Sequence, residues 1–337
     1  MSTLTTIHPR HALFGAEAAS HHLPVCDHYA GVEARMRKSL ALQAEMAEDA
    51  GRAVFDVTLD LEDGAPVGGE HEHALLVAEL LNSPANAWGR VGARVHDVRH
   101  KRFEDDIDTL IGQAGAKLAY LMVPKLADVD DTRRAVEAVK AARIKHGVGH
   151  AIPVHGLIET LSGLRAVAHI AAVPGMESLS FGLMDFVSAH NGAIPGAAMG
   201  SPEQFEHPLI CRALTDISAA CHAHGKVPSH NVSTDIKHPD RAGRDAARAR
   251  NEFGYLRKWS IHPDQIAPIV SAFRPSHEEV TQAAAILAAA QDASWGPIQH
   301  DGRLHDRASY RYWWAVLQRA HTTGVDMPPA AAKRFFE

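Results

Sequence analysis

Short apolar runs and longer amphipathic stretches alternate along most of the chain. Residues 55–62 place apolar side chains at every second position, which is the period of a β-strand. Residues 130–146 and 161–172 are instead amphipathic with the spacing of a helix. Strands that alternate with helices in this way are typical of an α/β protein with a mostly parallel sheet.

Eight strands can be assigned from these runs. They extend over about 250 residues, which is the strand number and the length of a (β/α)₈ barrel, also called a TIM barrel. A doubly wound open sheet is the alternative, because the first and the seventh runs carry weaker strand patterns. The expected strands are residues 11–14, 53–62, 91–96, 118–125, 151–158, 178–182, 226–230 and 259–262.

The pattern changes after residue 275, where helical runs replace the alternation. Ser276 precedes a helical run over residues 277–292, and a second run over residues 308–322 is rich in Tyr and Trp. We therefore expect a TIM-barrel catalytic domain over residues 1–275, in which residues 1–50 form an atypical N-terminal segment. Residues 276–337 would form a helical C-terminal extension, whose aromatic side chains are expected to pack against another surface such as a neighbouring subunit.

Composition and charge exclude several classes of protein. The 337 residues carry 34 Lys and Arg against 40 Asp and Glu, and the net charge of −6 argues against a nucleic-acid binder. The apolar runs are too short to span a bilayer, so no membrane partner is expected. No secretory signal is visible, and the scattered Cys26, Cys211 and Cys221 fit the reduced cytoplasm. The 24 His residues suggest metal ligation or a pH switch.

The second expected strand, residues 53–62, carries the first candidate functional residues. Its apolar residues at 55, 57, 59 and 61 alternate with Asp56, Thr58, Asp60 and Glu62. In a barrel the apolar side must face the helices, so the acidic side would face the interior, where carboxylates need partners or a metal. The alternative is an edge strand with one solvated polar face.

The ends of the fifth and sixth strands carry a pair of acids. Catalytic groups of a barrel come from the C-terminal ends of its strands, and Glu159 and Asp185 follow successive strands. Two carboxylates suit Mg²⁺, or Mn²⁺ in its place, because such an ion keeps coordination positions open for substrate. Glu159 alone could equally be an acid at the start of a helix. With Asp185 placed equivalently one unit later, we favour a metal pair.

Six short motifs follow one another in a characteristic order and spacing: LDLEDGAP at 59–66, ARVHD at 93–97, VPK at 123–125, LIET at 157–160, FGLMD at 181–185 and IHPDQI at 261–266. Together they resemble the citrate lyase β-subunit and malyl-CoA lyase branch of the HpcH/HpaI aldolase superfamily. The resemblance implies a (β/α)₈ barrel, Mg²⁺ dependence and reversible cleavage of a carbon–carbon bond in a β-hydroxy acid or acyl-CoA thioester. It also implies a homotrimer or homohexamer in which a C-terminal lid reaches a neighbouring active site.

The resemblance also implies roles for single residues. Glu159 and Asp185 would be the metal ligands, and Arg94 would bind the carboxylate or thioester oxygen and stabilise an enolate through paired N–H donors. Asp306, the last residue of DGRLHD at 301–306, corresponds to an acid–base Asp of the lid. Glu62 is a further catalytic candidate close to the metal and its waters. The remaining substrate-binding candidates are Gly182, Leu183, Met184, Asp63, Lys125 and His230.

The chain also departs from the family pattern. The usual first-strand motif is represented only by residues 10–16, and His230 stands where members often have an acidic residue. Because surfaces that contact CoA lie partly in such loops, a free hydroxy or keto acid stays an alternative to a CoA thioester. The rival enzyme is an aldolase that uses free pyruvate or another small keto acid. The rival of another class is a non-catalytic regulatory or binding paralogue.

Overall fold

The computed structural model describes residues 7–14 and 23–337. This part of the chain forms two compact units. Residues 23–272 form the first unit, and residues 273–337 form the second together with residues 7–14. Nowhere in these described residues does a helix combine the length and the hydrophobicity that crossing a membrane requires.

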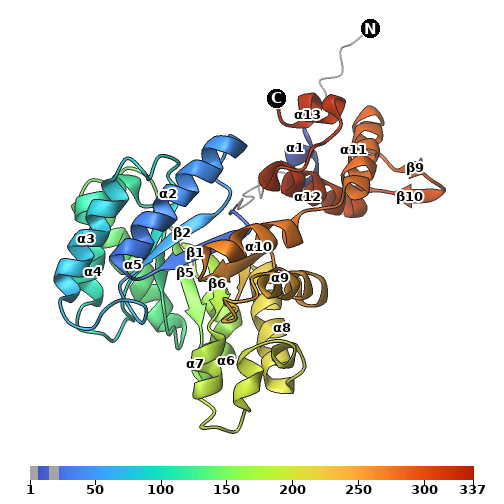
Figure 1. Ribbon diagram of the computed structural model, residues 1–337. Helices are drawn as coiled ribbons and strands as arrows, with labels where there is room; N and C mark the ends of the chain where they lie inside the picture. Colours follow the sequence, from blue (N-terminus) through green and yellow to red (C-terminus); the bar gives the residue numbers. More distant parts are fainter. Residues whose placement is uncertain (1–6, 15–22) are drawn as a thin grey trace. The chain divides into compact units, whose positions relative to one another are not determined.

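The first unit is a closed barrel of eight parallel strands in chain order (Figure 1). The first strand pairs with the second on one side and with the eighth on the other, which closes the sheet and excludes the doubly wound alternative. The expected (β/α)₈ barrel is therefore confirmed. The strands are β1 (Cys26–Ala30), β2 (Asp56–Asp60), β3 (Val91–Arg94), β4 (Leu121–Val123), β5 (Val154–Ile158), β6 (Met176–Phe181), β7 (Val227–His230) and β8 (Arg257–Ser260).

Helices cover the outside of the barrel, and side-chain caps set where some of them begin. Asp128 accepts hydrogen bonds from the N–H groups of Asp130 and Asp131 at the start of α5, and Thr160 accepts one from Gly163 at the start of α6. The helices are α2 (Glu33–Ala50), α3 (Glu70–Asn82), α4 (Phe103–Ala114), α5 (Val129–Lys145), α6 (Leu161–Ala171), α7 (Leu183–Ser188), α8 (Pro208–Ala223), α9 (Asp240–Phe253) and α10 (Ile266–Phe273). Short 3₁₀ turns are η2 (Gly115–Lys117), η3 (Gly196–Met199), η4 (Glu203–Phe205) and η5 (Pro263–Gln265).

The expected first strand over residues 11–14 is wrong. These residues lie in helix α1 (Pro9–Phe14), which belongs to the second unit. The strand that opens the barrel is β1, and its buried Asp27 and His28 hide it from a search for apolar runs. The other seven expected strands are confirmed, since each overlaps an observed strand.

Alternate residues of β2 point into the barrel and meet polar partners there. Arg90 Nε donates to Asp56 Oδ1 (2.7 Å), and Arg257 Nη2 lies 2.6 Å from Asp56 Oδ2 and 3.1 Å from Asp27 Oδ2. Thr58 Oγ1 donates to Asp27 Oδ1 (2.8 Å). The expectation that the acidic side of this strand faces the interior and finds partners is confirmed, and an edge strand is excluded. We call Asp27, Asp56, Arg90 and Arg257 the lower ion cluster.

The second unit joins the two ends of the described chain in one hydrophobic core. Leu13 of α1 packs in the same core as Tyr310 and Trp314, two of the clustered aromatic residues. Trp295 Nε1 donates to the backbone carbonyl of Ile7 (2.9 Å). The remaining elements of this unit, orange and red in Figure 1, are α11 (His277–Asp292), β9 (Ile298–His300), β10 (Arg303–His305), α12 (Arg307–Thr323) and α13 (Pro329–Phe335).

Candidate active site

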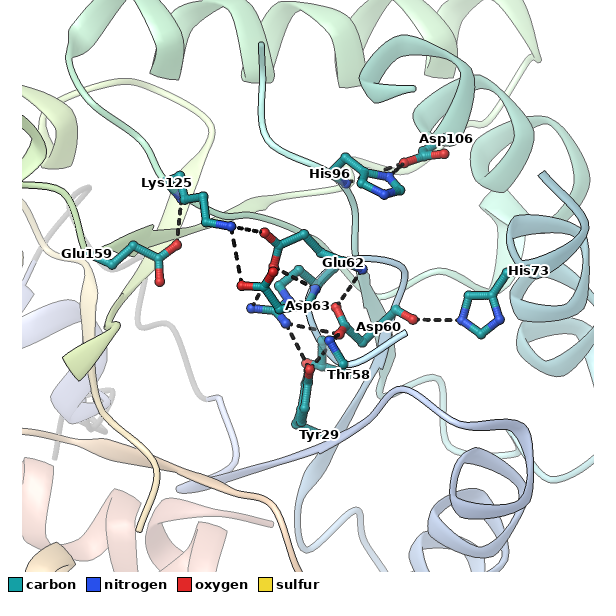
Figure 2. A network of polar contacts seen from close by, with 12 residues as sticks. Tyr29, Thr58, Asp60, Glu62, Asp63, His73, His96, Asp106, Lys125 and Glu159 are labelled. Atoms are coloured by element: carbon teal, nitrogen blue, oxygen red, sulfur yellow. Dashed lines mark hydrogen bonds and ion pairs between the residues drawn. The ribbon is translucent and has the colours of Figure 1, made fainter. Parts of the chain in front are cut away.

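Arg94, the last residue of β3, is held at the C-terminal end of the barrel by Asp60 and Tyr29. Its Nε and Nη2 donate to the two carboxylate oxygens of Asp60 (2.6 and 2.9 Å), and Nη2 also donates to the Tyr29 hydroxyl (2.8 Å). That hydroxyl donates in turn to Asp60 Oδ2 (2.5 Å), a contact that Figure 2 shows. Burial alone would raise the pKa of Asp60, yet the Arg94 guanidinium brings the pKa of this carboxyl below its usual range.

This pairing corrects one expectation about Arg94. The two parallel N–H donors expected for a substrate enolate already bind Asp60, so that edge of the guanidinium is occupied. The remaining nitrogen, Nη1, lies 3.2 Å from Glu62 Oε2. Arg94 also lines the cavity described below, so its positive charge, rather than its paired donors, would act on a molecule bound there.

The turn after β2 requires glycine at position 64, the last residue of the LEDG sequence at 61–64. Gly64 N–H donates to Asp60 Oδ2 (2.6 Å). A Cβ atom at this position would lie 1.9 Å from the Tyr29 hydroxyl and 2.6 Å from Asp60 Oδ2. Only glycine therefore allows the turn to close on Tyr29, Asp60 and Arg94.

Lys125 connects acids from two different strands. Its Nζ pairs with Glu62 Oε1 and lies 3.3 Å from Asp63 Oδ2, while its backbone N–H donates to Glu159 Oε1 (2.8 Å). Figure 2 shows Lys125 between Glu159 on one side and Glu62 and Asp63 on the other. These interactions link the ends of β2, β4 and β5.

Glu159 and Asp185 are the two acids that follow β5 and β6. Glu159 is 3% exposed, and a Cβ atom on Gly182 would lie 2.2 Å from its Oε2, so the carboxylate rests directly on the backbone after β6. Burial and the negative charge of Asp185 raise the pKa of Glu159 to about 8. An acid in this environment is stabilised in its charged form by a cation.

The donor set fits a hard divalent ion. Mg²⁺ takes one or two carboxylates from a protein and fills its other positions with water and substrate oxygens. Within residues 7–14 and 23–337, no group of three or more His, Cys, Asp or Glu side chains could hold a metal, so Glu159 and Asp185 would act without an imidazole or thiolate ligand. Of the 24 His residues, those described lie outside this site, and the metal signature suggested by their number is not carried by them.

A cavity of about 260 Å³ opens beside the two acids, which is room for a small organic acid or the acyl end of a larger molecule. Its lining combines three acids and Arg94 with apolar and aromatic side chains, which form what we call the apolar wall. The Tyr29 ring stacks on Trp259 in this wall (ring centroids 5.6 Å apart), and Arg94 lies over the Tyr29 ring. The lining residues are Tyr29, Asp63, Arg94, Leu157, Glu159, Phe181, Gly182, Leu183, Met184, Asp185, Asn231, Val232, Trp259 and Ile261.

Most of the residues singled out from the sequence meet at this cavity. Arg94, Glu159, Asp185 and Asp63 line it, as do Gly182, Leu183 and Met184. Glu62 and Lys125 pair with each other and connect to the lining residues Arg94, Asp63 and Glu159. The individual roles assigned to these residues stay predictions.

His230 does not line the cavity, which corrects its placement among the substrate-binding residues. Its ring stacks on Phe205 (5.3 Å) and meets Tyr255 edge-on, and its Nδ1 lies 3.0 Å from Lys258 Nζ. Successive residues of a strand face opposite sides, and the neighbouring Ser229 lies in register with inward-facing Arg257. His230 therefore points out of the barrel, toward the helices.

Asp306 lies in the second unit, outside the barrel. It is the N-cap residue of α12, where its Oδ1 accepts from the N–H of Ala308 (2.9 Å) and Ser309 completes a capping box. Its expected part in acid–base chemistry stays a prediction.

Sequence reasoning missed Tyr29, Asn231 and Trp259 as cavity residues. Tyr29 was hidden because the first strand was assigned to the wrong residues. Trp259 lies two residues before the IHPDQI motif, and a reading of inward positions along β8 would have found it, because Arg257 and Trp259 share the interior side. Asn231 directly follows β7 and is found once His230 is assigned to the outside.

Comparisons with known proteins agree with this geometry. Residues 39–263 match the family model described as HpcH/HpaI aldolase/citrate lyase. The chain is 30% identical over 289 residues to L-malyl-CoA/beta-methylmalyl-CoA lyase of Cereibacter sphaeroides, with 80% of this chain and 89% of that protein covered. It is 53% identical to the crystal structure of a citrate lyase from Burkholderia xenovorans LB400, with a TM-score of 0.84 over 98% of this chain and 99% of that one.

A more distant structure shares the fold. Protein CitE from Mycobacterium tuberculosis, solved in complex with magnesium, acetoacetate and coenzyme A, is 23% identical, with a TM-score of 0.63 over 88% of this chain and 98% of that one.

Proposed function

The chain belongs to the HpcH/HpaI aldolase/citrate lyase family, and we propose that it is a Mg²⁺-dependent carbon–carbon lyase that cleaves or forms a β-hydroxyacyl-CoA thioester or the corresponding β-hydroxy acid. The observation that carries this proposal is the pair Glu159 and Asp185 at successive strand ends, beside a cavity that Arg94 also lines. The relatives are named as lyases, and one more distant protein was solved with magnesium and coenzyme A.

The surroundings of the two acids suit the charge that develops in such a reaction. Cleavage of the carbon–carbon bond leaves an enolate, and fixed positive charge beside its oxygen lowers the barrier. Mg²⁺ held by Glu159 and Asp185 would supply Lewis acidity at the substrate oxygens. Arg94, fixed by Asp60 and Tyr29, adds a positive charge that does not have to reorganise during the reaction.

The remaining groups bind the substrate and move a proton. We assign the substrate carboxylate to the backbone around Gly182, Leu183 and Met184. We assign acceptance of the hydroxyl proton to Glu62 or to Asp306, the latter brought in by a second-unit lid in a homotrimer or homohexamer. The apolar wall around Trp259 excludes water from the enolate.

An activity panel tests the proposal. Purified protein is assayed with L-malyl-CoA, citramalyl-CoA, citrate and 4-hydroxy-2-keto acids, each with Mg²⁺ or Mn²⁺ and with excess EDTA. We expect turnover of a CoA thioester that EDTA abolishes, and its loss in Glu159→Ala and Asp185→Ala, which still fold. Full turnover in excess EDTA contradicts the metal role. Turnover of the 4-hydroxy-2-keto acids alone identifies a keto-acid aldolase, and absence of both turnover and metal binding identifies a non-catalytic paralogue.

A further inference from the structure

Lys125 has a backbone conformation that a residue with a side chain rarely adopts. It directly follows Pro124 after β4, and its φ angle is 53°, in the left-handed region. Such a conformation is unfavourable for a non-glycine residue and persists only where its surroundings impose it. Lys125 contacts acids from both of its ends: Glu159 through its backbone, and Glu62 and Asp63 through its side chain.

The backbone of Lys125 binds Glu159, the acid that follows β5. In the left-handed conformation the N–H of Lys125 points at Glu159 Oε1 (2.8 Å), while the carbonyl of the next residue, Leu126, accepts from Thr160 Oγ1 (3.1 Å). The loop after β4 is thereby attached to the loop after β5 by two hydrogen bonds. One oxygen of Glu159 is fixed, and Gly182 bounds the other closely.

The side chain of Lys125 binds the two acids that follow β2. Its Nζ pairs with Glu62, whose side chain is 6% exposed, and with the more exposed Asp63. Glu62 also lies 3.2 Å from Arg94 Nη1, so two cations hold it from two sides. Lys125 itself is not among the described residues that line the cavity.

We propose that Lys125 is a positioning residue, whose backbone N–H orients Glu159 and whose amine fixes Glu62 and Asp63, and that it does not bind the substrate. The proposal rests on the proposed function for the role of Glu159. It accounts for the left-handed backbone, because in that geometry one residue reaches an acid after β5 with its N–H and acids after β2 with its amine. It also replaces the expectation that Lys125 is one of the substrate-binding residues.

Three substitutions change the side chain of Lys125 and leave its N–H on Glu159 in place. Lys125→Met keeps the N–H and the length of the side chain but removes the charge, and Lys125→Gly also relieves the backbone. Lys125→Arg restores a cation. The matched control is Lys145→Met, which breaks an exposed pair with Asp108 on the outside of the barrel. The measurements are Mg²⁺ affinity by calorimetry on the protein without substrate, kcat and KM with L-malyl-CoA, and thermal melting.

We expect both uncharged variants to bind Mg²⁺ at least as tightly as the unmodified chain, because the N–H on Glu159 remains and one positive charge near the ion is gone. Loss of the amine should displace Glu62 and Asp63, and this displacement should lower kcat about tenfold or more while KM changes less than about threefold. Lys125→Arg should recover part of kcat, and Lys145→Met should change nothing.

Two results would overturn the proposal. A tenfold rise in KM with kcat retained identifies Lys125 as a substrate ligand, and a loss of Mg²⁺ affinity as large as that of Glu159→Gln shows that the side chain, not the N–H, holds the metal acid. If the unmodified chain neither binds Mg²⁺ nor turns over L-malyl-CoA, the proposed function fails instead. Melting still tests the geometry in that case. Lys125→Gly should melt above Lys125→Met, and an equal or lower melting temperature contradicts the strained backbone.

Discussion

Strand β2 carries buried acids at both of its ends, and the clusters around the two ends differ in charge balance. At its start, Asp56 belongs to the lower ion cluster, in which two acids meet two guanidinium groups. At its other end lies what we call the upper acid cluster: Asp60, Glu62, Asp63, Glu159 and Asp185, with Arg94 and Lys125 as the cations that pair with its members. The lower cluster is complete without a ligand, whereas the upper cluster has an excess of negative charge facing a cavity. Charge balance thus separates groups that hold the barrel together from groups that we propose bind a cation and a substrate.

The largest expected effect comes from breaking the lower cluster. Arg257→Leu leaves Asp27 and Asp56 buried with Arg90 as the only remaining cation of that cluster, which should lower the free energy of unfolding by about 3–5 kcal/mol. Urea denaturation of the metal-free protein measures it. Arg37→Leu, which removes an exposed ion pair on α2, should cost less than about 1 kcal/mol. Equal stability of the two variants would remove the structural role of the lower cluster.

The upper acid cluster should make the stability of the metal-free protein depend on pH. The pKa of Glu159 is raised to about 8 from an ordinary value of 4.5, so between these two pH values the folded metal-free protein binds more protons than the unfolded chain. Its free energy of unfolding should therefore fall as pH rises through this window, by a few kcal/mol in total from Glu159. Denaturation curves at several pH values measure the slope. Glu159→Gln should flatten it, and saturating Mg²⁺ should reverse the loss at pH 8. An unchanged slope in Glu159→Gln would contradict the assignment.

A smaller effect is expected from crowding Glu159, the proposed metal ligand, without changing any charge. Gly182→Ala places a methyl group 2.2 Å from Glu159 Oε2, so the carboxylate must move. We expect kcat/KM to fall about 10- to 100-fold while most of the stability remains, because the misplacement of one ligand affects geometry more than packing. Steady-state kinetics with titrated Mg²⁺ measures it. Gly149→Ala is the matched control, since a Cβ there meets nothing within 4 Å.

The smallest expected effect concerns the hydroxyl that braces Arg94. Tyr29→Phe removes the hydrogen bonds to Asp60 and Arg94 and keeps the ring on Trp259. A loss of about tenfold in kcat/KM is expected, because both hydrogen bonds act on the substrate only through the position of Arg94, which Asp60 still holds. The exposed Tyr312→Phe of the second unit serves as the control. An unaffected Tyr29→Phe enzyme would show that Asp60 alone positions Arg94.

Alternation and strand ends predicted much of the barrel from the sequence. The acidic side of β2 could be assigned to the interior because its apolar side is uninterrupted, and the pair Glu159 and Asp185 follows from the rule that catalytic groups lie at the C-terminal ends of barrel strands. The partners of these acids were not predictable. Asp56 pairs with Arg257, which lies some two hundred residues further along the chain, and no local pattern records that contact.

The errors also have local causes. β1 was missed because two of its five residues are Asp27 and His28, both buried by partners that only the closed barrel supplies. His230 was placed in the site because a shift of one residue along a strand exchanges inside and outside. The left-handed backbone of Lys125 has no sequence signal at all, since the usual residue there would be glycine.

The joining of Leu13 and Ile7 to the C-terminal helices has a consequence for the order of events on the ribosome. Residues 7–14 are synthesised before the barrel, but their partners at Trp295 and in α12 emerge only after the barrel has been translated. Because nascent domains fold as they emerge, the barrel can form while α1 still waits for its partners. Deletion of residues 7–14 should therefore loosen the core of the second unit and leave the barrel folded.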